Sequence, residues 1–170
     1  MNTSRRTFLL GTAVLAWARD GITEGTGAVD QRSLGHSENG CGPAAVLNLL
    51  KFSRPDLLAV YENLVGGDSG TKLRFFVDRY LRDRDSVVYP GQDRWGVHGV
   101  ATADLLIALN ELLADGASPE LKGCYLDRNE EESHAEHLQR CHRWMRKSLE
   151  REVSPILSLR SFFVKHREEN

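Results

Sequence analysis

The sequence predicts an α+β domain in which a layer of helices packs on an antiparallel sheet. Two observations lead to this prediction. Apolar residues recur at helical spacing through much of residues 43–115, whereas the strand patterns come mostly late in the chain. The chain stops soon after the last of these patterns, so we expect the sheet to be incomplete at its C-terminal end. The 170 residues suffice for one domain with a substantial core.

The first eighteen residues are typical of a cleaved export signal. Arg5 and Arg6 precede an apolar run over residues 8–18, which is shorter than the about 20 residues of a membrane-spanning helix. Residues 4–10 match the twin-arginine motif except at Leu10, where Lys is common. We therefore expect export by the twin-arginine translocation machinery, cleavage after Ala18, and a periplasmic or extracellular location without a stable membrane span. An uncleaved short anchor is the alternative.

Charge and cysteine content narrow the functional classes. Hydrophobic residues make up 41% of the chain and charged residues 27%, as in ordinary globular proteins. Lys and Arg are interspersed with Asp and Glu beyond residue 18, and the absence of a basic stripe predicts no nucleic-acid partner. Three cysteines are an odd number for an oxidising compartment. We expect Cys124 and Cys141 to be paired or both buried, and Cys41 to be free.

The domain is predicted to begin at Asn39. Residues 19–38 are rich in Gly, Ser, Thr and charge, which indicates a linker. A helix follows whose start lies within a residue or two of Cys41, because Pro43 suits a first helical turn. Apolar residues surround this helix over positions 44–52, so it should be buried on most sides.

Four more helices are predicted from apolar spacing and end signals. They cover residues 53–66 with Ser53 as N-cap, residues 69–82, residues 102–116 with Thr102 as N-cap, and residues 129–153. The last has a predicted buried stripe made of Leu138, Cys141, Met145 and Leu149. Strands are predicted at residues 87–89, 122–126 and 156–164.

Four side chains on the last helix raise the question of a metal. They are His134, His137, Cys141 and His142, and spacings of three and seven residues can bring ligands to one helical face. Two of them fall on or beside the apolar stripe, which packing alone explains. We therefore predict no metal site, and nothing in the sequence calls for another cofactor.

Cys41 is the residue that the sequence nominates as a nucleophile. A thiol attacks as its thiolate, and the dipole and free amides of a helix N-terminus favour an anion there and can hold an oxyanion. Gly40 and Gly42 remove side chains on both sides, so a substrate backbone could approach. The alternatives are a buried small hydrophobe and a redox thiol, although no Cys-x-x-Cys pair supports the latter.

The segment Asn39-Gly-Cys-Gly-Pro-Ala-Ala, followed by an apolar helix, resembles the nucleophile segment of papain-like cysteine peptidases. It is most similar to the bacterial double-glycine-leader, bacteriocin-processing group, and the resemblance is strongest over residues 39–52. It implies a papain-like fold and a thiol hydrolase acting on peptide bonds, with a peptide or protein substrate and no cofactor, and the N-terminal signal adds that the hydrolase is exported. Cys41 alone carries over by position.

The resemblance also implies a side-chain oxyanion donor. In the family this donor is a Gln six residues before the nucleophile, where this chain has Gly35. Gln31 and Asn39 are the nearby amides that could serve instead. Asn39 could equally cap the helix.

The general base is the second partner that the resemblance implies, as a His that opens an apolar strand. His166 follows the last strand pattern, and His98 lies in a glycine-flanked loop. No apolar strand follows His166, so we expect the domain to be partial, with the base and its carboxylate encoded beyond Asn170. The alternative is a peptide-binding module that lacks catalysis.

Overall fold

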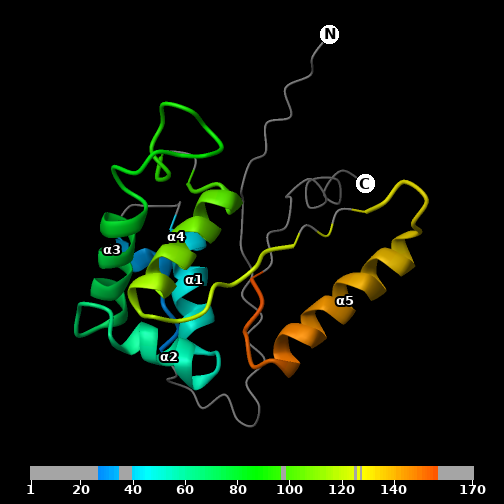
Figure 1. Ribbon diagram of the computed structural model, residues 1–170, viewed down its shortest axis with the longest axis horizontal. Coiled ribbons are helices and arrows are strands. Elements are labelled where there is room, and N and C mark those ends of the chain that lie inside the picture. Colours follow the sequence, from blue (N-terminus) through cyan, green and yellow to red (C-terminus); the bar gives the residue numbers. More distant parts are fainter. Residues whose placement is uncertain (1–26, 35–39, 97–98, 125, 127, 157–170) are drawn as a thin grey trace, which may run out of the picture.

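The computed structural model describes residues 27–34, 40–96, 99–124, 126 and 128–156. Within these residues the chain forms α-helices and one short 3-10 helix, and it contains no β-strand. Helices α1 to α4 form one packed body, and α5 lies to one side of it (Figure 1). The elements in chain order are η1 (Gln31–Leu34), α1 (Cys41–Lys51), α2 (Pro55–Glu62), α3 (Ser69–Tyr80), α4 (Thr102–Asp115) and α5 (His134–Glu150).

Helix α1 is the centre of the body. Every residue from Pro43 to Leu50 is buried, and α1 contacts α2, α3, α4 and η1. The prediction that apolar residues surround this helix is confirmed. Because its neighbours enclose it, the position of its first turn is fixed by packing on most sides.

The helix ends differ from the predictions by a few residues, and local hydrogen bonds explain why. Pro55 is the first residue of α2, so Arg54 is its N-cap, and the Ser53 hydroxyl instead donates to the carbonyl of Leu49 at 2.5 Å. Asp68 caps α3 by accepting from the amides of Gly70 and Thr71. The cap of α2 therefore lies one residue after the predicted Ser53, whereas α3 begins at Ser69, as predicted.

The predicted α+β class is wrong for the described residues, which are helical. Extended segments do pass over the helices, but side chains satisfy their backbone. The Asn48 amide accepts from the Val29 N–H at 2.8 Å and donates to the Val29 carbonyl at 3.1 Å. Asn110 makes the same pair of bonds to Leu121, both at 2.9 Å. An asparagine on a helix thus replaces the neighbouring strand that each extended segment would otherwise need.

At residues 87–89, which lie in a loop, side chains again take the place of a neighbouring strand. The buried Asp104 carboxylate accepts from the Ser86 hydroxyl at 2.6 Å and from the Val87 N–H at 2.8 Å. Ser86 in turn accepts from the amides of Val88 and Tyr89. The predicted strand is therefore a turn wrapped around one hydroxyl, and its valines and tyrosine are exposed. Among its described residues, the loop has only isolated bridges, at Asp85 with Asp93 and at Gly96 with Gly99.

The other two predicted strands receive no support. Of residues 122–126, those that are described have no regular secondary structure. Of residues 156–164 only Ile156 is described, and the rest lie outside the described residues.

The predicted linker includes residues that pack on the helices. Val29 is buried in the core, and η1 contacts both α1 and α3. Arg74 of α3 donates to the Ser33 carbonyl at 3.1 Å, which holds η1 against that helix. The packed part of the chain therefore includes residues before Asn39.

Helix α5 is separate from the body. Each of its residues is at least partly exposed, and within the described residues α5 contacts none of the other helices. It begins at a capping box formed by Ser133 and Glu136, later than predicted. Its end is tied back to the corner between α1 and α2, where Arg54 N–H donates to the Glu152 carbonyl at 2.7 Å and Ser154 bonds to Ser53.

Candidate functional site

Cys41 is the first residue of the central helix. Its thiol is free and half-buried, and it has no hydrogen-bond partner among the described residues. Gly40 precedes it in helical conformation and offers no side chain to cap the helix. Because Pro43 has no N–H, the amides of Cys41 and Gly42 are the donors that the first turn leaves without intrahelical partners. A partly accessible sulfur therefore lies beside two backbone donors.

The space beside the two glycines is occupied by protein. A Cβ on Gly40 would lie 3.1 Å from the Gln31 carbonyl oxygen and from Leu34, and a Cβ on Gly42 would lie 3.3 Å from Leu105. The glycines therefore allow η1 and α4 to approach the start of α1. Their role in the fold is close packing of the elements around Cys41.

Gln31, one of the two amides considered as oxyanion donors, lies next to this helix start. It begins η1, and its backbone and Cβ meet the Gly40 position directly. Asp30 fixes the turn by accepting from the Arg32 N–H at 2.9 Å. The structure thus brings Gln31 to the residue that precedes Cys41, although ten positions separate Gln31 and Cys41 in sequence.

Several predicted site residues lie outside the described residues. These are the signal residues Arg5 and Arg6, the amide Asn39, and the proposed bases His98 and His166. Three other histidines are described, and all of them belong to α5.

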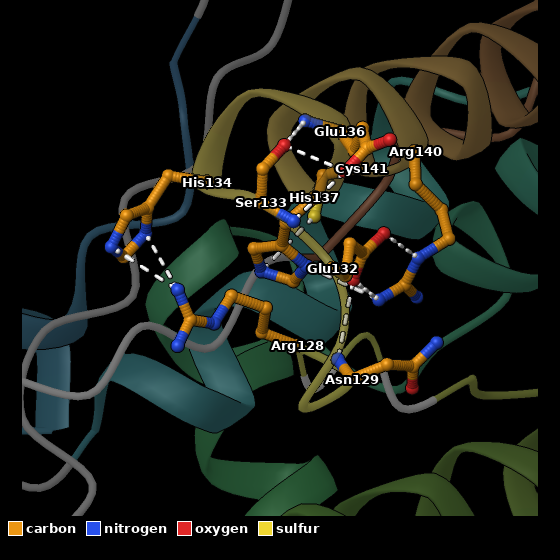
Figure 2. Close-up of polar contacts among 9 residues, drawn as sticks. All are labelled: Arg128, Asn129, Glu132, Ser133, His134, Glu136, His137, Arg140 and Cys141. Carbon is orange, nitrogen blue, oxygen red and sulfur yellow. Dashed lines mark hydrogen bonds and ion pairs between the residues drawn. The ribbon is translucent and has the colours of Figure 1, made fainter.

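A second cluster of reactive side chains is found at the start of α5. Figure 2 shows the His137 ring beside the Glu132 carboxylate and near the Cys141 sulfur. His137 Nε2 lies 3.8 Å from Cys141 Sγ, and His137 Nδ1 lies 3.4 Å from Glu132 Oε2. A thiol, an imidazole and a carboxylate therefore follow one another in space, which is the order in which a thiol, its base and an orienting group are arranged in nucleophilic sites.

Arg140 completes the second cluster. Its Nε and Nη2 donate to the two Glu132 oxygens at 2.8 and 2.7 Å, and Nη2 also lies 3.2 Å from His137 Nδ1. The hydrogen bond from Arg140 is the largest cause that lowers the pKa of Glu132 from 4.5 to about 2. Glu132 is therefore a carboxylate at any ordinary pH.

The capping box sets the register of this cluster. Ser133 accepts from the Glu136 amide while Glu136 accepts from the Ser133 amide at 2.9 Å, which starts the helix at His134. His137 and Cys141 then stand one turn apart on the same face. His134 turns away and meets Arg128 instead (Figure 2).

Sequence reasoning missed this arrangement in part. The four-residue spacing of His137 and Cys141 is visible in the sequence, where it is typical of metal ligands or of residues that pack on one helical face. The capping box could have indicated the helix start. Helical periodicity does not reveal that Glu132, which precedes the helix, reaches His137. Within the described residues no group of three or more His, Cys, Asp or Glu side chains is placed to hold a metal ion.

The cysteines differ from the expected pairing. Cys124 and Cys141 are both free thiols, Cys124 is exposed, and Cys141 is half-buried. The prediction that they pair or are both buried is therefore wrong. Cys41 is free, as predicted.

Comparisons with known proteins leave the chain without an assigned family. No family model, no curated protein and no solved structure matches it. Among the described helices, none has both the length and the apolar character needed to cross a membrane.

Proposed function

We propose that this protein acts through the Cys41 thiol as a nucleophile on peptide bonds. One observation carries the proposal: a free, half-buried thiol stands at the first residue of the helix that the rest of the body encloses. Packing on most sides holds the sulfur in place, as a nucleophile requires. The local resemblance of residues 39–52 to peptidase nucleophile segments supports the same choice.

The proposed chemistry uses backbone groups that are already in place. The Cys41 thiolate attacks the carbonyl carbon, a C–S bond forms, and the amides of Cys41 and Gly42 receive the developing oxyanion. The C–N bond then breaks as the amine leaves with a proton, and water hydrolyses the thioester. Gln31 is the side chain we propose as a further oxyanion donor, because its backbone packs at Gly40.

The general base is proposed from residues outside the described ranges, with His98 and His166 as the candidates. We also propose that the protein works after export by the twin-arginine machinery, as residues 1–18 indicate.

The test compares three thiols in one chain. The protein lacking residues 1–18 is treated with limiting iodoacetamide, and mass spectrometry follows each cysteine. Exposure alone predicts that Cys124 reacts first, because it is the exposed thiol. If the helix start promotes the thiolate, Cys41 should react about ten times faster than Cys124.

A second measurement connects reactivity to function. Wild type and Cys41→Ser are incubated with a random peptide library, and cleavage products are identified by mass spectrometry. We expect cleavage by wild type and none above background with the variant. Slow alkylation of Cys41 together with no cleavage would contradict the proposal. Peptide capture by both proteins without cleavage would instead favour the non-catalytic peptide-binding module.

A further inference from the structure

The second cluster on α5 is independent of Cys41 and contains its own thiol. The groups around this sulfur determine whether hydrogen bonding favours its thiol or its thiolate. A guanidinium has only donors, so the contact of Arg140 Nη2 with His137 Nδ1 at 3.2 Å makes Nδ1 an acceptor and places the ring hydrogen on Nε2. That hydrogen then points to Cys141 Sγ, 3.8 Å away.

The charged form of His137 gives the same result at the sulfur. If the ring takes a second proton, Nδ1–H faces the Glu132 carboxylate at 3.4 Å, and Nε2–H still faces Cys141. The neutral ring with its hydrogen on Nε2 and the charged ring each present an N–H donor to the sulfur. A donor of this kind stabilises a thiolate more than a thiol, because the thiolate is the stronger acceptor.

We propose that Cys141 is a modification site of this protein, a peroxide-reactive thiol that is oxidised to a sulfenic acid with His137 as its positioning residue. The sulfur is half-buried but reachable, and α5 packs on none of the other described helices. The proposal uses no residue of the Cys41 site and stands whether or not Cys41 is a nucleophile.

The reaction is a two-electron transfer to hydrogen peroxide or an organic hydroperoxide. The Cys141 thiolate attacks one peroxide oxygen, so that an S–O bond forms as the O–O bond breaks. The departing hydroxide or alkoxide takes a proton from Nε2 of the charged His137 ring or from water, and leaves as water or an alcohol. Sulfur is oxidised by two electrons and the peroxide is reduced by two.

Charge near the sulfur supports this chemistry. The hydrogen bonds that Arg140 donates to Glu132 are the main cause that raises the pKa of Arg140, and desolvation partly opposes it. The Cys141 and Cys124 sulfurs add smaller electrostatic contributions in the raising direction. His137 is therefore the group in contact with Cys141. Cys141 and Cys124 both lie within electrostatic range of the Arg140 guanidinium, which is paired with Glu132.

The experiment tests whether hydrogen-bonding geometry or solvent exposure determines which cysteine is oxidised first. The chain is treated with limiting hydrogen peroxide in the presence of dimedone, and mass spectrometry measures the rate of sulfenic-acid labelling at each cysteine. Exposure favours labelling of Cys124, whereas the hydrogen-bonded cluster favours Cys141. We expect Cys141 to be labelled first at pH 7 and His137→Gln to slow its labelling by about tenfold.

A matched variant and a pH series separate this role from a structural one. His142→Gln changes an exposed histidine directly after Cys141 that, in the described part of the chain, does not bond to it, and should leave the rate unchanged. Raising the pH should restore the His137→Gln rate toward wild type, because every thiol then ionises. Faster labelling of Cys124 than of Cys141, or an equal Cys141 rate in His137→Gln and wild type at pH 7, would overturn the proposal.

Discussion

The α1–α4 body and helix α5 are held in place by different means. In the body, apolar side chains are buried and the few buried polar groups have partners. Lys72, for example, donates to the carbonyls of Tyr61, Glu62 and Leu64 at the end of α2. In α5 every residue is partly exposed, and order comes from a capping box and a polar cluster. Burial therefore stabilises the body, whereas local hydrogen bonds stabilise α5.

The difference predicts two levels of stability within one chain. Regions with few buried contacts open locally at lower free energy than the packed core. The two proposed thiols belong to different levels: Cys41 begins the enclosed helix, and Cys141 lies on the exposed one. A substitution in the body should therefore lower the stability of the whole molecule, whereas a substitution in α5 should affect only the stability of α5.

The largest effect is expected from the core. Phe76 is completely buried, and its ring packs against Tyr80 with centroids 5.6 Å apart. Phe76→Ala should lower the free energy of unfolding by about 3 to 5 kcal/mol, since a cavity is left in a packed core. Leu138→Ala on α5, where the side chain is 68% exposed, should change it by less than about 0.5 kcal/mol. Urea unfolding followed by circular dichroism measures both, and similar losses would refute the comparison.

The second effect concerns a buried carboxylate. Asp104→Ala leaves the Ser86 hydroxyl and the Val87 N–H without their acceptor, and should cost about 2 to 3 kcal/mol in the same assay. The matched control is Asp78→Ala, because Asp78 is exposed and, among the described residues, pairs only with Arg82, at 2.6 Å. That change should cost no more than about 0.5 kcal/mol. Equal costs for the two aspartates would mean that Asp104 is not the anchor of its loop.

The same loop explains why the fold class could not be predicted. Residues 87–89 have the β-branched and aromatic composition of a strand, and nothing local reveals that Ser86 and Asp104 satisfy their amides. The partner of Ser86 is eighteen residues away on a helix. Helices were predictable because their hydrogen bonds are internal and their apolar spacing is local, whereas a strand depends on a partner that periodicity does not identify.

The candidate sites also contain some features that local sequence predicts and others that it does not. Cys41 was predictable because Pro43 and the apolar run mark a helix start within the sequence itself. The approach of Gln31 to Gly40 was not, because it depends on how η1 packs against α1 and α3. In α5, the His137 and Cys141 pair follows from helical spacing, but Glu132 reaches His137 from a segment outside the helix. For Gln31 the missing information was tertiary packing, and for Glu132 it was the local path of the chain just before the N-cap Ser133.

The third effect is confined to α5 and depends on pH. The folded-state pKa of Glu132 is about 2, below its ordinary 4.5, so the stabilisation it brings is complete above pH 4.5 and is lost as pH falls toward 2. Arg140→Gln should raise this pKa toward 4.5, because the hydrogen bond from Arg140 is its largest cause. A carbon-13 NMR titration of the Glu132 carboxyl measures the pKa directly. An unchanged midpoint in the variant would show that Arg140 does not hold the carboxylate.

The smallest effect tests whether α5 is stabilised locally. Ser133→Ala removes the hydroxyl that accepts from the Glu136 amide and should weaken the first turn of α5 by about 1 kcal/mol. Because α5 contacts no other described helix, this loss should raise amide hydrogen exchange at residues 134–140 and leave exchange in α1 unchanged. The variant should also slow peroxide labelling of Cys141, since His137 is held in that turn. Faster exchange in α1 would instead mean that α5 and the body unfold as one cooperative unit.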